Sequence, residues 1–498
     1  MKILLASSEV FPFSKSGGLA DVVGALGRTL GELGHEVQII TPYYKCVAEK
    51  ELELEPNPWM THVTLNHTDV FGALRGYQWQ KNVKVLFLDH QEFFDRDGLY
   101  GTKGNDYEDN AARFLFFCKA IWQWVKFGSF KPDIIHLHDW QTALFPLIWH
   151  HLERTGDPKA IAQASKSNPK TVLTIHNLAY QGVFQSPQYP LAELPWDYYN
   201  ENGVEFFGQW NCLKAGIIYA DKLTTVSPKY AEEIQQDELG CSLNGVLSSR
   251  KHDLSGILNG VDYSEWKTQN NPNLPVSFGI SSLGMKSRMK KSLQKEVGLE
   301  PINEFPVFAN IGRIVEQKGM DILIPALKTL LQEGTPFQFV QLGTGDPNYE
   351  SQIKSLAKEF PQQVSANIKY DHSLAHRIEA GSDFFLMPSR FEPCGLNQLY
   401  SLRYGSIPIV RATGGLHDSV TDFSENLAHA NGFKFSSYTI ESLLHVIRQA
   451  LALFQDRHLL NKFRKNAMRE DFSLKGFAEE YVEIYQEARE SRYSPAPH

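Results

Sequence analysis

Short apolar runs alternate with stretches of helical apolar spacing along both halves of the chain. Each run is rich in Val, Ile and Leu and is bounded by polar or turn residues, as the strands of a parallel sheet are. The predicted strands are residues 2–7, 36–41, 83–89, 132–139, 170–176 and 222–227 in the first half, and 306–312, 337–343, 367–371, 383–388 and 407–412 in the second. The predicted helices are residues 21–33, 110–127, 319–332, 349–360, 395–404, 440–454 and 473–490.

This alternation predicts an α/β protein with two doubly wound domains, because parallel strands need a crossover that is usually a helix. We expect residues 1–259 to form the first domain and residues 260–472 the second, with a polar, proline-bearing join near 260–275. Helix 473–490 is expected to pack back on the first domain, and residues 491–498 to form a disordered tail. Such sheets bind ligands beyond the carboxyl ends of their strands, so the pattern predicts a ligand-binding cleft between the domains.

Composition limits the class of protein further. Of the 498 residues, 42% are hydrophobic and 21% are charged, which is ordinary for a globular protein of two or three domains. The net charge of −8 argues against electrostatic binding to nucleic acid or to an anionic membrane. The first apolar run is too short for a signal peptide, and no stretch approaches the roughly 20 apolar residues of a membrane span. With five scattered cysteines that suit a reducing compartment, these features predict a cytoplasmic protein.

A pair of glycines, Gly17 and Gly18, lies between the first strand and the first helix. Glycine lets a ligand approach the main chain, and the helix that follows offers free N–H groups and a positive dipole to a phosphate. Lys15 adds a positive charge beside them. The loop matches neither G-x-G-x-x-G nor G-x-x-x-x-G-K-[ST], so the nicotinamide and P-loop motifs are both absent. From spacing alone, a tight strand-to-helix turn and a phosphate site are equally supported.

Two cations, Arg313 and Lys318, follow the first strand of the second half. Together they can neutralise a diphosphate and stabilise the charge that builds as it leaves. An isolated pair of this kind is better explained as a surface pair. Further along, a Thr-Gly-Gly sequence at residues 413–415 again follows a strand and opens a helix, which predicts a second backbone cradle for phosphate.

The segment SRFEPCGLNQLYSLRYG, residues 389–405, carries the most chemical information. It follows the strand 383–388, turns through a proline and a glycine, and begins a helix. Glu392 is therefore expected at the carboxyl end of that strand, close to a helix N-terminus. The alternative is a carboxylate that begins a helix and has no chemical role. Cys394 has no evident base near it in the sequence, which argues against a nucleophilic cysteine.

Histidines gather at two places in the sequence. The H-x-H-D string at residues 136–139 and the pair His372 and His376 both have residue types that bind metals. Neither has a complete ligand set nearby in the sequence, so we predict no metal site. Asp139 and His176 each end a strand of the first half, where an open sheet presents its ligand-binding residues. We therefore interpret these two as substrate contacts.

Several motifs, in the same order along the chain, resemble those of bacterial-type glycogen and starch synthases, glycosyltransferase family 5. They are KSGGLADV at 15–22, HDW at 138–140, TIHNLAYQG at 174–182, RIVEQKG at 313–319, EPCGLNQL at 392–399 and TGGL at 413–416. The resemblance extends from Lys2 to about Tyr485. It implies a GT-B fold, in which two Rossmann-like domains face each other across a cleft, and transfer of glucose from ADP-glucose to an α-1,4-glucan.

The resemblance also implies which residues act in catalysis. The residues matched to the family's catalytic positions are Lys15, Asp139, His176, Arg313, Lys318 and Glu392. The implied reaction is retaining transfer to the non-reducing 4-hydroxyl of the glucan, with no metal or other cofactor and with domain closure that excludes water. Since the sequence shows no unambiguous covalent nucleophile, we expect the acceptor to attack from the face that ADP leaves.

Further residues are implied to bind substrate. They are Gly17, Gly18, Asp21, Tyr100, Asn259, Tyr370, Cys394, Gly395, Leu396, Thr413, Gly414 and Gly415. In the family, the aromatic at the place of Tyr370 stacks on adenine, and the residue at the place of Tyr400 is a second glutamate in many related enzymes. ADP-glucose, ADP and a glucan are the implied partners. Association with glycogen particles or starch granules is left open.

Three alternatives compete with this interpretation. Another retaining GT-B enzyme, such as a sucrose synthase, is disfavoured by the lysine-glycine loop and by EPCGLNQL. A glucan phosphorylase would need a pyridoxal-phosphate lysine and a far longer chain. A non-catalytic glucan-binding scaffold is disfavoured because Lys15, Arg313, Lys318 and Glu392 are all present.

Overall fold

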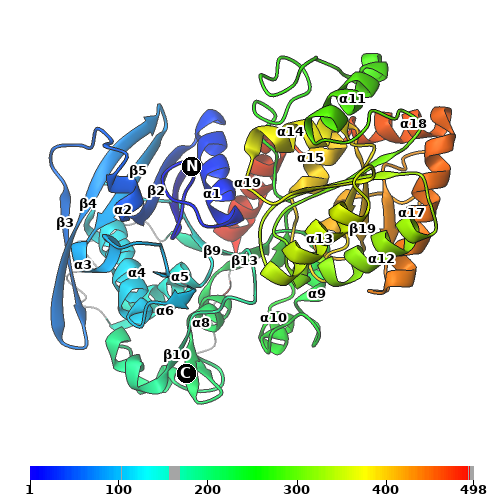
Figure 1. The fold of residues 1–498 in the computed structure, drawn as a ribbon. Helices are drawn as coiled ribbons and strands as arrows, with labels where there is room; N and C mark the ends of the chain where they lie inside the picture. Colours follow the sequence, from blue (N-terminus) through cyan, green and yellow to red (C-terminus); the bar gives the residue numbers. More distant parts are fainter. Residues whose placement is uncertain (103, 156–168, 492, 494–498) are drawn as a thin grey trace. The chain divides into compact units, whose positions relative to one another are not determined.

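The computed structural model describes residues 1–102, 104–155, 169–491 and 493, and the chain groups into two compact units (Figure 1). Unit 1 comprises Met1–Val226, Ala231–Gly260 and Leu474–His498, and unit 2 comprises Ser227–Tyr230 and Val261–Ser473. Sequence analysis placed residues 227–230 in the first domain. They group with unit 2 because Ser227 Oγ donates to the Pro393 carbonyl at 2.7 Å. Of the predicted tail, all but residues 491 and 493 lies outside the described residues.

Unit 1 is built on one large sheet. Its strands are β1 (Lys2–Ala6), β2 (Glu36–Pro42), β3 (Trp59–Leu65), β4 (Thr68–Gln80), β5 (Val83–Asp89), β8 (Ile134–His138), β9 (Lys170–Ile175), β13 (Lys222–Thr225) and β14 (Leu254–Gly256). They lie in the order β14-β13-β9-β8-β1-β2-β5-β4-β3. All neighbours pair in parallel except β4, which is antiparallel to both β5 and β3. Every strand predicted in the first half is therefore present in this sheet.

The hairpin β3–β4 was not predicted. Its strands alternate buried and exposed positions instead of forming apolar runs, as antiparallel strands with one solvated face do. Two small sheets complete the strands of unit 1, one formed by β10 (Val183–Gln185), β12 (Gln209–Asn211) and β11 (Glu205–Phe206), the other by β6 (Gly101–Thr102) and β7 (Asn105–Asp106).

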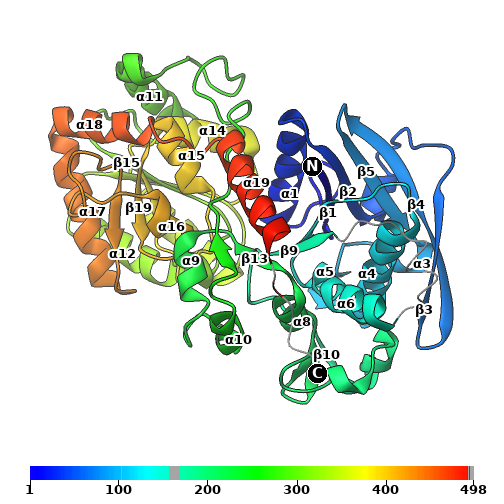
Figure 2. The same ribbon diagram turned by 180° about the vertical axis from the view of Figure 1, so that it is seen from behind.

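Helices cover the large sheet of unit 1. They include α1 (Gly18–Glu32), α4 (Asn110–Phe127), α5 (Trp140–Ala143), α6 (Phe145–Thr155), α8 (Cys212–Tyr219), α10 (Asn244–Ser249) and α19 (Leu474–Glu490). Figures 1 and 2 both show α19 beside α1, although the two helices come from opposite ends of the chain. Tyr485 of α19 places its hydroxyl 2.8 Å from Nδ1 of the buried His136 on β8. This contact joins the late helix to the centre of the sheet.

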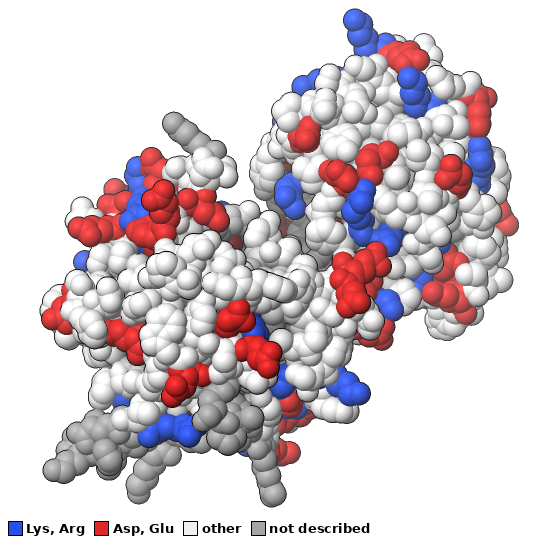
Figure 3. All heavy atoms as spheres, turned by 90° about the horizontal axis from the view of Figure 1, so that it is seen from below, with Lys and Arg blue, Asp and Glu red and all other residues white. Residues whose placement is uncertain are grey.

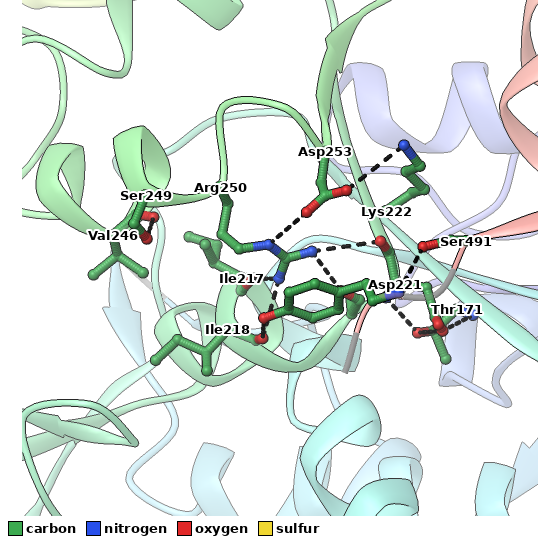
Figure 4. A network of polar contacts seen from close by, with 12 residues as sticks. Thr171, Ile217, Ile218, Asp221, Lys222, Val246, Ser249, Arg250, Asp253 and Ser491 are labelled. Carbon is green, nitrogen blue, oxygen red and sulfur yellow. Dashed lines mark hydrogen bonds and ion pairs between the residues drawn. The ribbon is translucent and has the colours of Figure 1, made fainter. Parts of the chain in front are cut away.

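A buried arginine fixes the chain around the end of α8 (Figure 4). The guanidinium of Arg250 donates to the carbonyls of Ile218 at 3.0 Å and Ala220 at 2.8 Å, and it pairs with Asp253 at 3.0 Å. The last carbonyls of a helix have no partner within the helix and attract a cation. The ring of Tyr493, a residue after the end of α19, lies over the same guanidinium at 3.6 Å.

Unit 2 contains one parallel sheet. Its strands are β15 (Val307–Ile311), β16 (Gln338–Leu342), β17 (Val364–Asn367), β18 (Phe384–Met387), β19 (Ile407–Arg411) and β20 (Phe433–Phe435), in the order β17-β16-β15-β18-β19-β20. This is the strand order of dinucleotide-binding folds. The predicted strand at 367–371 is wrong, because β17 ends at Asn367 and Asp371 already caps the next helix by accepting from Leu374 N at 2.9 Å.

The helices of unit 2 are α11 (Lys286–Glu296), α12 (Met320–Gln332), α13 (Pro347–Glu359), α14 (His372–Gly381), α15 (Asn397–Tyr404), α16 (Gly414–Ser419), α17 (Ile440–Gln455) and α18 (Arg457–Ala467). α11 and α18 were not predicted, because charged residues interrupt their apolar spacing. Some of those charges are buried. Asp383 pairs with Lys290 of α11 at 2.9 Å and with Arg464 of α18 at 2.6 Å, so an ion-pair network holds both helices to the start of β18.

The charged surface is mixed. On the face shown in Figure 3, basic and acidic side chains are interspersed among uncharged ones. Among the helices within the described residues, none is long and apolar enough to cross a membrane.

Candidate active site

In each unit, several candidate residues lie in loops beside the point where the strand order reverses, whereas Asn259 and Tyr370 follow the edge strands β14 and β17. In unit 1, β1 lies between β2 and β8, and the glycine loop, Asp139 and His176 follow β1, β8 and β9. In unit 2, β15 lies between β16 and β18, and the loops that carry Lys318 and Glu392 follow these two strands. A reversal point is where an open parallel sheet has room for a ligand beyond its carboxyl edge.

The glycine loop of unit 1 folds around a buried carboxylate, that of Glu9. This carboxylate accepts hydrogen bonds from Ser16 Oγ at 2.9 Å, from Ser16 N, from Gly17 N at 3.2 Å and from the Tyr100 hydroxyl at 3.0 Å. Sequence analysis did not identify Glu9, since it lies outside the motif that carries the resemblance. Burial, together with the negative charge of Glu9, raises the pKa of Tyr100 well above its usual value.

The glycines of this loop face open space. A Cβ atom on Gly17 or Gly18 would meet no atom within 4 Å, so the protein's own packing does not require glycine at either position. Lys15 lies beside them and pairs with Asp21, in the first turn of α1, at 2.7 Å. The loop therefore combines accessible backbone with a cation that a single exposed carboxylate holds in place.

The side chain of Asp139 contacts the backbone of His176. Asp139 caps α5 with a left-handed φ of 56°, and its Oδ1 accepts from His176 N at 2.7 Å. Burial raises the pKa of Asp139 to about 7, although N–H groups of His176 and Asn177 oppose the shift. A carboxyl with this pKa can change its protonation state near neutral pH.

The histidines behind Asp139 are neutral. His138 Nδ1 lies 3.1 Å from His176 Nε2, and burial lowers the pKa of His176 to about 3 and that of His138 well below its usual value. These imidazoles are therefore hydrogen-bonding groups and not cations at physiological pH. Asn259, predicted at the domain join, follows β14 in unit 1; it is buried, and within the described part of the chain its Oδ1 has no hydrogen-bond partner.

In unit 2 the central contact is an ion pair between Glu392 and Lys318. Glu392 is buried, with Oε2 2.5 Å from Lys318 Nζ and 3.0 Å from Ser389 Oγ. The exposed Arg313 contacts Gln317 Oε1 at 3.3 Å, and Gln317 in turn donates to the Phe391 carbonyl at 2.5 Å. The loops after β15 and β18 are thereby joined by the ion pair of Lys318 with Glu392 and by the contacts of Gln317.

The second glycine pair packs directly behind Glu392. Gly414 has a left-handed φ of 44°, and a Cβ atom there would collide with the Glu392 carbonyl. A Cβ atom on Gly415 would collide with Cys394, and Gly415 N donates to the Pro393 carbonyl at 3.1 Å. The structure therefore brings the predicted backbone segments 394–396 and 413–415 together at one place.

Two predicted tyrosines have very different surroundings. Tyr370 lies between β17 and α14 with 87% of its surface exposed, so its ring is available to a ligand. Tyr400, at the place of the second glutamate of related enzymes, lies flat on Trp266, with ring centroids 3.7 Å apart and an angle of 5° between the planes. Its ring is therefore engaged in packing.

Each unit is a Rossmann-like α/β unit with polar side chains beyond the carboxyl edge of its sheet, which is the architecture of GT-B glycosyltransferases. Residues 2–249 match the family described as starch synthase catalytic domain, and residues 294–470 match glycosyl transferases group 1. The chain is 44% identical to a glycogen synthase of Koribacter versatilis over 499 residues, covering 100% of both chains. It is 45% identical to a glycogen synthase of Anaeromyxobacter dehalogenans, covering 98% of this chain and 99% of the relative. The chain belongs to the glycogen and starch synthase family.

Solved structures agree with this assignment. The catalytic domain of starch synthase IV from Arabidopsis thaliana, a structure bound to ADP and acarbose, superposes with a TM-score of 0.85 at 31% identity, covering 98% of this chain and 99% of that one. Sucrose-phosphate synthase from Thermosynechococcus elongatus shares the fold, with a TM-score of 0.60 at 17% identity and 98% of each chain covered. The roles of individual residues stay predictions at this point.

Proposed function

We propose that the chain transfers glucose from ADP-glucose to the non-reducing 4-hydroxyl of an α-1,4-glucan with net retention of configuration. The observation that carries the proposal is the buried Glu392, which lies 2.5 Å from Lys318 at the reversal point of unit 2. The similar starch synthase IV is bound to ADP and acarbose, which supports a nucleoside diphosphate and a glucan as ligands.

The positive groups are suited to a diphosphate. Lys318 and Arg313 in unit 2 would neutralise the phosphates and stabilise the charge on the departing ADP, and Lys15 with the open glycine backbone would do the same from unit 1. Lys318 is paired with Glu392 and Lys15 with Asp21, so each cation has a carboxylate partner before a ligand binds. These groups supply charge without a metal ion, and the proposal therefore includes metal-independent transfer.

The bond changes follow from these positions. The bond between the anomeric carbon and the phosphate oxygen breaks, and a bond from that carbon to the acceptor oxygen forms on the same face. The acceptor proton passes to an oxygen of the departing ADP. The Glu392 carboxylate and the backbone carbonyl of His176 would stabilise the oxocarbenium-like species, since negative groups fixed in advance stabilise developing positive charge. Because the His176 imidazole is neutral, it does not repel that positive charge.

Water must be kept from this species, because its hydrolysis would waste the donor. Domain closure on donor binding is therefore part of the proposal. Small-angle scattering with and without ADP tests it, since closure predicts a smaller radius of gyration with ADP and an unchanged radius contradicts it. Binding to glycogen particles or starch granules is expected from the glucan acceptor, and co-sedimentation tests it.

The deciding experiment compares sugar donors. Purified protein is incubated with radiolabelled ADP-glucose or UDP-glucose, a maltooligosaccharide primer and EDTA. A preference for ADP-glucose supports the proposed donor, and elongation that persists in EDTA supports metal independence. An α-linked product, identified by NMR, supports retention of configuration. Preference for UDP-glucose, loss of activity in EDTA, or a β-linked product would each contradict one named part. No elongation from either donor would favour a glucan-binding scaffold.

A further inference from the structure

A cluster of side chains of metal-binding types lies in unit 2 at the start of α14, two residues after Tyr370. It consists of Glu265, His372 and His376, whose ligand atoms all lie within 4.8 Å of one another. The two histidines lie one turn apart at the start of α14, and Glu265 comes from the segment that follows the start of unit 2. Sequence analysis rejected this histidine pair because it had no third ligand nearby, and the fold supplies one from a distant segment.

Two of the three distances between ligand atoms in the cluster fit a small tetrahedral ion. His376 Nε2 lies 3.3 Å from His372 Nε2, and His372 Nε2 lies 3.0 Å from Glu265 Oε1. Two ligands of a tetrahedral ion with bonds of about 2.0–2.1 Å are roughly 3.3 Å apart. The two imidazole planes meet at 88°, so the Nε2 atoms of His372 and His376 approach each other from different directions.

Neighbouring side chains orient the buried His376. Its Nδ1 lies 2.8 Å from the hydroxyl of Tyr404, and that hydroxyl donates its single proton to the Lys267 carbonyl at 3.0 Å. Nδ2 of Asn271 lies 3.3 Å from the same Nδ1, so the protein engages this nitrogen from two sides, and Nε2 is the atom that faces His372. Trp266 stacks on the His376 ring at 4.2 Å and holds its plane.

We propose that Glu265, His372 and His376 bind a divalent transition-metal ion of the Zn²⁺ class, with one coordination position open to water. Two imidazoles and one carboxylate are a ligand set that Zn²⁺ accepts, whereas Mg²⁺ and Ca²⁺ prefer oxygen ligands. The ordinary alternative is a hydrogen bond between His372 and Glu265 with no ion. A bound ion would join the segment around Glu265 to α14 within unit 2. The inference does not depend on the proposed glucosyl transfer.

The test measures binding of Zn²⁺ to the full chain. Protein treated with EDTA and desalted is titrated with Zn²⁺ by calorimetry, as wild type and as the variants His372→Ala, Glu265→Ala and His429→Ala. His372 and Glu265 have side chains that are 45% and 46% exposed, so their removal should leave the fold intact, which circular dichroism checks. The matched control, His429, is an exposed histidine of the same unit outside the cluster.

We expect the wild type and His429→Ala to bind one Zn²⁺ that the two cluster variants bind at least about tenfold more weakly. Co²⁺ should give the visible absorption of tetrahedral coordination in wild type and lose it in His372→Ala. A Zn²⁺ affinity that is equal in all four proteins would overturn the proposal, because the ion would then bind elsewhere. Absence of Zn²⁺ binding in the wild type would overturn it as well. Neither result depends on whether ADP-glucose is a substrate.

Discussion

The two carboxyl-edge clusters are built from different kinds of groups. In unit 1, burial shifts the groups that follow β8 and β9 toward their neutral forms, since it lowers the pKa of His176 to about 3 and raises that of Asp139 to about 7, while the Glu9 carboxylate accepts hydrogen bonds from the glycine loop. In unit 2, a buried carboxylate, Glu392, pairs with Lys318, and Arg313 lies nearby. Unit 2 therefore holds fixed charge at its sheet edge, while unit 1 presents hydrogen-bonding groups and open backbone.

This difference suggests a division of work. Fixed charges act on groups whose charge changes during a reaction, which in the proposed reaction are the departing diphosphate and the anomeric carbon. Neutral groups and glycine backbone act on shape and hydrogen bonds, which set position. Substitutions in unit 2 should therefore change the rate most, and substitutions in the glycine loop should mainly change binding.

The largest effect is expected from Glu392→Gln. Loss of the carboxylate removes the negative charge that would stabilise the oxocarbenium-like species, and kcat should fall by about 10²–10³-fold. Initial rates with ADP-glucose and a maltooligosaccharide measure it. Glu425→Gln, which breaks an ion pair with Lys434 elsewhere in unit 2, is the matched control and should keep wild-type activity. A near-normal kcat in Glu392→Gln would contradict the proposal that the fixed charges of unit 2 affect the rate more than the groups of unit 1 do.

A smaller loss is expected from Lys318→Ala or Arg313→Ala. Each substitution removes a charge-assisted contact of about 1.5–3 kcal/mol to the leaving diphosphate, which corresponds to roughly 10–100-fold in rate. The same kinetic assay applies, with Arg448→Ala as control, because Arg448 pairs with Glu333 on the surface of the same unit. Full activity in both site variants would show that neither cation acts on the leaving group.

Substitutions of two glycines should distinguish an effect on stability from an effect on donor binding. Gly17→Ala places a methyl group in open space, so the free energy of unfolding should change by less than about 1 kcal/mol, while the KM for the donor rises. Gly414→Ala places a methyl group against the Glu392 carbonyl at a left-handed φ, and it should destabilise unit 2 by more than about 1 kcal/mol. Urea unfolding and KM measure the two quantities. An unchanged KM in Gly17→Ala would mean that the loop does not bind the donor.

The smallest effect concerns pH. An unfolded histidine protonates near pH 6.5, whereas His176 in the fold stays neutral down to about pH 3. Between these values the unfolded chain binds more protons, so this group makes the free energy of unfolding decrease as pH falls. The His176→Gln variant should take up about one proton fewer on unfolding in this pH range. Its free energy of unfolding should therefore depend less on pH than that of the wild type. Urea midpoints from pH 7 to pH 4 measure the difference, and parallel curves would contradict the buried neutral state.

Much of the fold could be predicted because parallel strands that are buried on both faces are continuous apolar runs. β1, β8 and β15 are runs of this kind, and each was predicted within a few residues. The elements that were missed are those with weak local signals. The hairpin β3–β4 has one solvated face, and α11 carries lysines whose partners, such as Asp383, are far along the chain.

The candidate site could be predicted only where a motif is local. Lys318 and Glu392 lie in separate motifs, and the structure shows that they meet, although nothing in their spacing predicts the contact. Glu9 was missed because its partners belong to the loop and to Tyr100, which is distant in sequence. The cluster of Glu265 with His372 and His376 was missed for the same reason, since a third ligand from another segment leaves no local pattern.

The place of α19 in the sequence has a consequence for synthesis on the ribosome. This helix completes unit 1, but its residues, Leu474–Glu490, are translated only after the whole of Val261–Ser473. Until then, His136 in the centre of the large sheet lacks the Tyr485 hydroxyl, and one side of α1 is uncovered. The segment Val261–Ser473 is complete before α19 emerges. The nascent chain therefore contains an incomplete unit 1 throughout the synthesis of unit 2.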